Sequence, residues 1–214
     1  MSTGILFDLD GTLLDTLEDL CDGTNYALAQ FGYPVRTLAE VRRFVGNGAA
    51  NLIAQAVPTG ADPAPVLAAF QSYYPNHCQI KTAPYAGILP ALKTLAKRFP
   101  VAIVSNKPDA AVKPLCARYF PGIFALGETA GCPRKPAPDM VYKAMREIGA
   151  DRCIYVGDSE VDVRTAKNAG VPCLSVLWGF RDRAEIEQAG GTDFCTDPSM
   201  LVPVLLHWEE NHGE

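Results

Sequence analysis

The chain has 214 residues, a formal net charge of −5, and a composition of 48% hydrophobic and 20% charged residues. These values are typical of one globular domain with room for a modest insert, and they exclude a disordered chain. The acidic balance argues against a nucleic-acid partner, because binding to a phosphate backbone depends on clustered Lys and Arg.

The first predicted element is a buried strand at residues 5–7, an apolar run that ends in a carboxylate. The residues that follow it show only helical patterns and contain no convincing strand. Among them, Asp15 with Glu18 and Thr37 with Glu40 have the spacing of helix capping boxes.

From residue 82 onward, helical stretches alternate with apolar strands predicted at 101–104, near 124, at 153–156 and at 173–176. This alternation predicts a parallel sheet with helices on both faces. We therefore predict an α/β fold with a Rossmann-like parallel sheet core flanked by helices, and an all-helical cap inserted after the first strand. The core would comprise residues 1–14 and 82–214, and the cap residues 15–81.

Four polar segments lie at or beside the predicted strand ends, at residues 8–12, 105–107, 134–136 and 157–162. In an open parallel sheet, ligands bind at the carboxyl ends of the strands. We therefore expect the four segments to converge on one site.

In the first of these segments, Asp8 and Asp10 stand two positions apart where the strand ends. Residues at i and i+2 share a face of an extended chain, so both carboxylates could point toward one reacting centre. One could attack while the other handles protons, provided that their environments differ. The alternative is a turn with helix-capping aspartates.

In the last segment, Asp158 and Asp162 have the spacing of one helical turn. Together with Asp8 they would form a site of hard oxygen ligands suited to Mg²⁺. The alternative is a helix N-cap with a solvated acidic face.

Lys135 and Ser105 belong to the two middle segments. Prolines flank Lys135 and could direct its ammonium inward, where it would keep an attacking carboxylate ionised. The hydroxyl of Ser105 could bind an anionic oxygen. Taken alone, each has an ordinary alternative, a surface lysine and a helix N-cap.

In this order, DLDGTLLDT, SNKP, KPAPD and GDSEVD resemble the motifs of the haloacid dehalogenase superfamily of phosphotransferases. The resemblance spans essentially the whole chain, including a helical insert directly after the first motif. Within the superfamily the chain is most similar to the phosphoglycolate phosphatases, through the VGNG stretch in the cap, SNK, and GDSEVDVRTAKNAG.

The resemblance implies that Asp8 is a nucleophile that forms an aspartyl-phosphate. It implies that Asp10 is the general acid and then the general base, and that its backbone carbonyl binds Mg²⁺. Lys135 would be the charge-balancing catalytic lysine. Asp158 would bind the metal directly, and Asp162 directly or through water. The expected phosphate-binding residues are Thr12, Ser105 and Asn106.

The cap is expected to close over the site and to set specificity, as inserted lids commonly do. Arg42, Arg43 and the amides around Asn47 are candidates to bind a substrate carboxylate, because the guanidinium fork binds carboxylate in two places. The alternative is a surface arginine pair on an amphipathic helix.

The expected activity is therefore Mg²⁺-dependent hydrolysis of a small phosphomonoester, with 2-phosphoglycolate as the expected substrate. Phosphatases for pyrophosphate, nucleoside monophosphates or sugar phosphates would share the core motifs, and so would a sugar-phosphate mutase. A phosphonate hydrolase would need a cap lysine, and the cap has none apart from Lys81 at its hinge. A non-catalytic binding protein is disfavoured because both Asp8 and Asp10 are present.

The remaining expectations concern the setting of the protein. No apolar stretch approaches the ~20 residues of a membrane helix, and no signal-peptide pattern opens the chain. Seven cysteines without CxxC spacing and only three histidines argue against a zinc site. We expect a cytoplasmic monomer or homodimer with reduced cysteines, whose partner is a small phosphoester and neither nucleic acid nor membrane.

Overall fold

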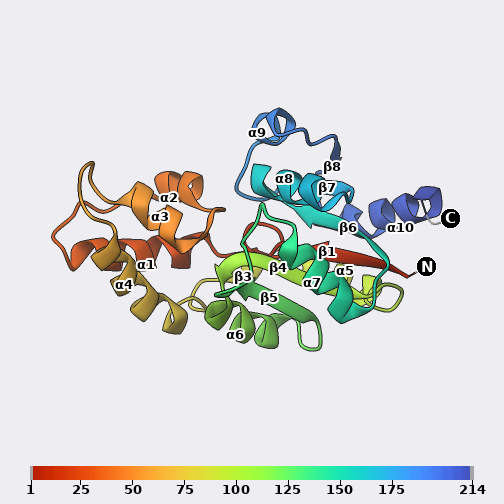
Figure 1. The fold of residues 1–214 in the computed structure, drawn as a ribbon, viewed down its shortest axis with the longest axis horizontal. Coiled ribbons are helices and arrows are strands. Elements are labelled where there is room, and N and C mark those ends of the chain that lie inside the picture. The colour runs from red at the N-terminus through yellow and green to blue at the C-terminus, as the bar shows by residue number, and fades with distance from the viewer. Residues whose placement is uncertain (1, 213–214) are drawn as a thin grey trace.

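In the computed structural model, which describes residues 2–212, six parallel strands form the central sheet in the order β5-β4-β1-β6-β7-β8 (Figure 1). All five residues of β1 are buried, which explains its continuous apolar run. This sheet confirms the predicted α/β fold class. Its strands are β1 (Thr3–Phe7), β4 (Val101–Pro108), β5 (Phe124–Glu128), β6 (Arg152–Gly157), β7 (Cys173–Val176) and β8 (Asp193–Cys195).

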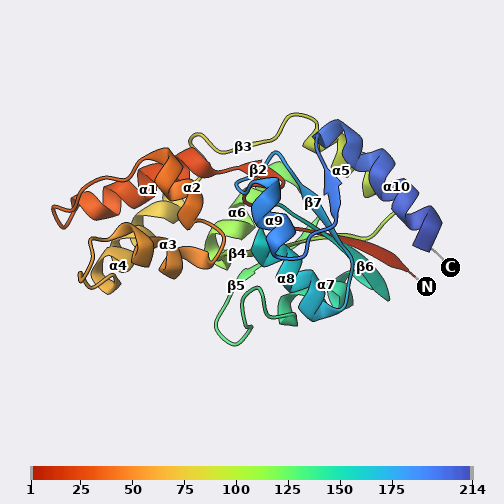
Figure 2. The same cartoon turned by 90° about the horizontal axis from the view of Figure 1, so that it is seen from above.

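Helices cover both faces of the sheet (Figure 2). Leu6 of β1 packs in one apolar cluster with α7 and α8, whereas its neighbours Ile5 and Phe7 pack in another with α5, α6 and α10. Successive side chains of a strand point to opposite faces, so β1 contributes to both clusters. The core helices are α5 (Ile88–Leu95), α6 (Asp109–Tyr119), α7 (Asp139–Ile148), α8 (Glu160–Ala169), α9 (Arg183–Gln188), η2 (Pro198–Met200) and α10 (Leu201–His212).

A group of helices between β1 and β4, here called the helical insert, lies beyond one end of the sheet (Figures 1 and 2). Thr37 caps α2 as expected, since its side chain accepts a hydrogen bond from the Glu40 amide and the Glu40 side chain accepts one from the Thr37 amide. The insert consists of α1 (Leu17–Ala29), α2 (Leu38–Phe44), α3 (Gly48–Ala56), α4 (Ala64–Tyr73) and η1 (Tyr74–Asn76).

The two connections between core and insert pair with each other in a short antiparallel ribbon, β2 (Leu14–Asp15) with β3 (Ala83–Pro84). The expected capping box of Asp15 and Glu18 is wrong, because Asp15 is part of this ribbon and Thr16 is the N-cap residue of α1. Buried Asp19 accepts hydrogen bonds from the amides of residues 80–82, which ties α1 to the returning connection.

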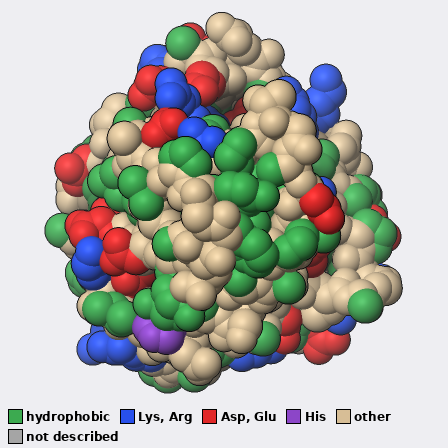
Figure 3. Space-filling view, turned by 90° about the vertical axis from the view of Figure 1, so that its left-hand side faces the viewer, with side chains coloured by type: hydrophobic (Ala, Val, Ile, Leu, Met, Phe, Trp, Pro, Cys, Tyr) green, Lys and Arg blue, Asp and Glu red, His purple; other side chains and the backbone are tan. Residues whose placement is uncertain are grey.

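The outer end of the insert carries apolar side chains across the middle of its face, with charged groups mostly toward the edge (Figure 3). The exposed large hydrophobic residues between β1 and the returning connection are Tyr26, Phe31, Val35, Leu38 and Ile80. Among the described residues, no helix is long and apolar enough to cross a bilayer.

Candidate active site

A cavity lies where β1, β4 and β6 end, between the core and the insert. Each of the four polar segments contributes at least one residue to its lining, as we expected from their positions at strand ends. From the core these include Asp8, Asp10, Ser105, Asn106, Lys107, Lys135 and Asp158. From the insert they include Leu20, Gly46, Gly48, Leu52, Phe70 and Tyr74.

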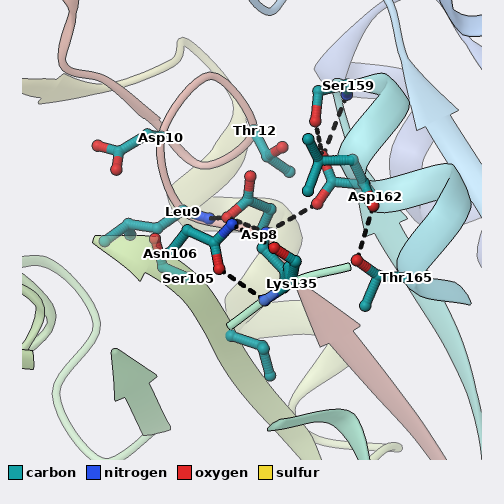
Figure 4. A network of polar contacts seen from close by, with 12 residues as sticks. Asp8, Leu9, Asp10, Thr12, Ser105, Asn106, Lys135, Ser159, Asp162 and Thr165 are labelled. Atoms are coloured by element: carbon teal, nitrogen blue, oxygen red, sulfur yellow. Dashed lines mark hydrogen bonds and ion pairs between the residues drawn. The ribbon is translucent and has the colours of Figure 1, made fainter. Parts of the chain in front are cut away.

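Lys135 lies between two carboxylates at the bottom of the site (Figure 4). Its ammonium is 2.8 Å from Oδ1 of Asp8 and 2.8 Å from Oδ1 of Asp162. Asn106 fixes the backbone of Lys135, since its Oδ1 accepts a hydrogen bond from the Lys135 amide and its Nδ2 donates one to the Lys135 carbonyl. The segments at 105–107 and 134–136 are therefore held together by one amide side chain.

The charges in this group are not balanced. Burial of Asp8 and the nearby charge of Asp162 raise the pKa of the Asp8 carboxyl well above its ordinary value, although Lys135 opposes the shift. Burial alone would lower the pKa of Lys135, but Asp162 and Asp8 outweigh it, so that pKa is raised and the ammonium stays charged.

Asp158 is the third carboxylate of the group. It is buried, and its Oδ1 accepts a hydrogen bond from Oγ1 of Thr12 at 3.1 Å while its Oδ2 accepts one from the Phe180 amide at 2.7 Å. Two glycines make room for it. A Cβ on Gly11 would lie 2.3 Å from Oδ2 of Asp158, and a Cβ on Gly179 would lie 2.3 Å from its Cβ.

These carboxylates fit a divalent cation. Oxygens of Asp8, Asp158 and Asp162 lie within 4.8 Å of one another, and burial together with Asp162 raises the pKa of Asp158 to about 7. When all three carboxylates are ionised, the ammonium of Lys135, which pairs with Asp8 and Asp162, leaves two net negative charges in the group. Hard oxygen ligands with this excess charge are the donor set that Mg²⁺ prefers.

Asp162 already uses both of its oxygens in contacts with the protein. Oδ1 accepts from Lys135, and Oδ2 accepts from the amide and the hydroxyl of Ser159, which completes a capping box at the start of α8. Asp162 does take part in capping α8, but the N-cap residue is Ser159 and both Asp158 and Asp162 are buried. The alternative of a helix N-cap with a solvated acidic face is therefore wrong.

Asp10 faces a different cation. Figure 4 shows its carboxylate pointing away from the group of Asp8, Lys135 and Asp162. Lys107 at the end of β4 donates from Nζ to Oδ1 of Asp10 and to the hydroxyl of Tyr74 in the insert, both at 2.8 Å. Burial alone would lower the pKa of Lys107, but Asp10 and Tyr74 outweigh it and raise the pKa.

The predicted phosphate-binding residues differ in their placement. Ser105 and Asn106 line the cavity, and the Ser105 hydroxyl accepts a hydrogen bond from the Lys107 amide. Asn106 also donates to the carbonyl of Gly46, which connects it to the insert. Thr12 is fully buried, and its hydroxyl supports Asp158.

Arg42, Arg43 and Asn47 are not among the described residues that line the cavity. Arg42 donates from Nε to the carbonyl of Phe180 at 2.8 Å and from Nη2 to that of Gly179 at 2.9 Å. The glycines on either side of Asn47 do reach the lining. The glycines at 46 and 48 therefore reach the site, whereas Arg42, Arg43 and Asn47 do not line it.

Arg181 is a cavity residue that the sequence did not suggest, and it is buried. It forms an ion pair with Glu160 at 2.9 Å. Its guanidinium also donates to carbonyls at the C-terminal end of α2, those of Arg42, Arg43 and Val45. Tyr74 was missed in the same way, whereas Lys107 belongs to the segment at 105–107 that was expected at the site but had no role assigned to it.

Comparisons with known proteins give a consistent set of relatives. The family described as haloacid dehalogenase-like hydrolase matches residues 5–176. A phosphoglycolate phosphatase of Pseudomonas syringae pv. syringae is 34% identical over 94% of this chain and 79% of its own length. One of Mesorhizobium japonicum is 35% identical over 84% of each chain. A crystal structure from Lactobacillus delbrueckii subsp. bulgaricus, provisionally named a phosphoglycolate phosphatase, is 36% identical with a TM-score of 0.88 over 94% of this chain and 97% of that one.

Proposed function

This chain belongs to the haloacid dehalogenase-like hydrolase family, and from that premise we propose that it hydrolyses 2-phosphoglycolate to glycolate and phosphate with Mg²⁺ as cofactor. The broader class, a phosphoric monoester hydrolase, follows from the family and its phosphatase relatives. The observation that carries the mechanism is the ammonium of Lys135 between Asp8 and Asp162, beside Asp158 and at the wall of one cavity.

In the first step, Asp8 attacks the phosphorus atom. Its Oδ1 accepts from Lys135 and from the Leu9 amide, so Oδ2, which has no protein partner among the described residues, is the attacking atom. A bond forms between Oδ2 and phosphorus, the bond from phosphorus to the glycolate oxygen breaks, and that oxygen takes a proton from Asp10. Lys135 stabilises the ionised form of Asp8 and the phosphoryl oxygens.

In the second step, water attacks the aspartyl-phosphate. Asp10 takes a proton from the water as the new oxygen–phosphorus bond forms. The bond between phosphorus and Oδ2 of Asp8 breaks, which releases phosphate and restores the carboxylate. Asp10 is then protonated again, so both aspartates return to their starting states.

For the metal, we propose Asp8, Asp158 and the backbone carbonyl of Asp10 as direct ligands. Asp162 would act through water, because its two oxygens keep their contacts with Lys135 and Ser159 in that way. When bound, Mg²⁺ neutralises charge on the transferring phosphoryl group. The fit rests on the buried oxygens and on their uncompensated charge.

For the substrate, we propose that Ser105, Asn106 and Thr12 form or support the phosphate pocket, and that residues 15–81 act as a cap over the core of residues 1–14 and 82–214. Support for the cap is that insert residues line the same cavity as the catalytic aspartates. Arg42, Arg43 and the amides around Asn47 stay candidates for the substrate carboxylate, with Gly46 and Gly48 at the lining.

Phosphate release from a panel of substrates tests the proposal. We expect Mg²⁺-dependent turnover, with 2-phosphoglycolate ahead of pyrophosphate, nucleoside monophosphates and sugar phosphates. Asp8→Asn should abolish it, because an amide does not attack phosphorus. Unchanged turnover in that variant would remove Asp8 as nucleophile, and a poor rank for 2-phosphoglycolate would overturn the substrate while leaving the class. Mutase activity would appear as bisphosphate-dependent isomerisation of a sugar phosphate.

The proposed setting is a cytoplasmic monomer or homodimer. Cell fractionation and light scattering of the purified protein test these two points separately.

A further inference from the structure

Lys107 is a buried cation that the proposed mechanism does not use. Its side chain is 2% exposed, and its ammonium contacts the carboxylate of Asp10 and the hydroxyl of Tyr74. A buried charge of this kind is costly unless it is paired, so its two partners define its position. One partner belongs to the catalytic loop and the other to the insert.

We propose that Lys107 is a positioning residue that holds Asp10 on the leaving-group side of the cavity, and that the hydroxyl of Tyr74 in the insert holds the Lys107 ammonium in place. The inference rests on the proposed function, in which Asp10 delivers a proton to the leaving oxygen. The inference adds Lys107 to the residues that support this proton transfer, and it assigns the insert a contribution through Tyr74.

The geometry separates the work of the two aspartates. Asp8 is held by Lys135, and Asp10 is held by Lys107, so each carboxylate has its own cation. Lys107 takes Oδ1 of Asp10, and Oδ2 accepts no hydrogen bond among the described residues. The free oxygen is the one that can carry a proton to the leaving group.

Tyr74 presents its hydroxyl from a fixed position. It is 2% exposed, and its ring stacks on Phe70 with the centroids 4.8 Å apart. A Cβ on Gly23 of α1 would lie 2.9 Å from the Tyr74 ring, so α1 closes the other side. The ammonium of Lys107 also lies 4.8 Å from the centroid of that ring. The Lys107 ammonium therefore has both of its partners, Asp10 and Tyr74, only when the insert covers the core.

A comparison of leaving groups tests this role. Proton delivery matters for an alkyl phosphate such as 2-phosphoglycolate, whose leaving oxygen is strongly basic, and matters little for 4-nitrophenyl phosphate. The measured quantity is the ratio of kcat/KM for the alkyl substrate to kcat/KM for the aryl substrate. For each substrate, kcat/KM reports only the steps up to loss of the leaving group. The later attack of water on the aspartyl-phosphate therefore does not affect the ratio.

In Lys107→Met we expect the ratio to fall about tenfold or more, which is part of the 10²–10⁴-fold that general acid catalysis typically contributes, because Asp10 itself is still present. Tyr74→Phe should lower it by a smaller factor, because it removes one hydroxyl. In the double variant Lys107→Met/Asp10→Asn the ratio should equal that of Asp10→Asn alone, because Lys107 acts through Asp10. Lys97→Met, at an exposed lysine after α5, should leave the ratio unchanged.

Equal falls for both substrates in Lys107→Met, or additive falls in the double variant, would overturn the inference and indicate that Lys107 binds phosphate or only supports the fold. If Lys107→Met does not fold, as judged by its thermal transition, Tyr74→Phe decides, and an unchanged ratio in that variant overturns the inference. Turnover that survives Asp8→Asn would instead overturn the proposed function, and the inference with it.

Discussion

Arg42 of the insert and Arg181 of the core each donate hydrogen bonds to backbone carbonyls in the other's segment. Arg42 reaches the carbonyl of Phe180 at 2.8 Å, and Arg181 reaches the carbonyl of Arg42 at 2.9 Å. The Phe180 amide in turn donates to Asp158. One short loop after β7 therefore contacts both the insert and a carboxylate proposed as a metal ligand.

Loss of the Arg42 side chain tests what this residue does. In Arg42→Ala we expect kcat/KM to fall about fivefold or more, since two hydrogen bonds of roughly 1 kcal/mol each are lost. Loss of these contacts, which hold the insert to the core, should lower kcat/KM similarly for 2-phosphoglycolate and for ethyl phosphate. Arg146→Ala, at an exposed arginine near the end of α7, is the control, with a small effect on both. A fall confined to 2-phosphoglycolate would instead assign Arg42 to the substrate carboxylate.

Removal of the Lys135 ammonium should destabilise the metal-free protein. Lys135→Met leaves Asp8 and Asp162 buried without their shared cation, and breaking a buried ion pair in this way costs roughly 3–5 kcal/mol. Urea unfolding at pH 8 measures the loss, with Lys97→Met as the exposed control. A loss below about 1 kcal/mol would contradict the proposed electrostatic role of Lys135.

Metal binding should depend on pH through Asp158. Its pKa is raised from 3.8 to about 7, so between these values the folded state binds the proton more tightly than the unfolded chain does. The stability that this group contributes is full below about pH 4 and is lost as pH rises through about 7. A divalent cation held by Asp158 would replace the proton and restore stability where the carboxylate is ionised.

We therefore expect saturating Mg²⁺ to raise the Tm more at pH 8 than at pH 5.5, as measured by differential scanning calorimetry. In Asp158→Asn the rise should disappear at both pH values, and the metal-free variant should be more stable than the metal-free wild type at pH 8. Equal rises at both pH values in the wild type would show that Asp158 is not the titrating ligand.

Local patterns predicted much of this molecule. The apolar run of β1 indicated a buried strand, and Thr37 with Glu40 indicated a helix start, because both signals depend on neighbours in the chain. The segments at strand ends were expected to converge, since the carboxyl ends of parallel strands share one edge. The same reasoning identified the three carboxylates that the structure gathers.

The contacts between core and insert could not be predicted in this way. Arg181 lies 136 to 139 positions from the carbonyls that it binds, and Lys107 lies 33 positions from Tyr74. Residues this far apart in the chain form no spacing pattern from which their contact could be predicted. Asp15 shows the converse, because pairing with Ala83 in the ribbon prevailed over the capping box that its neighbours suggested.

The ribbon of β2 and β3 sets the outgoing and returning crossings of the chain side by side, with Leu14 opposite Pro84. A segment whose two ends meet can be exchanged for one of another length without disturbing the register of the six parallel strands. The ribbon therefore separates the geometry of the insert from that of the strand ends, so the proposed cap could be replaced while Asp8 and Asp158 keep their places at the sheet edge.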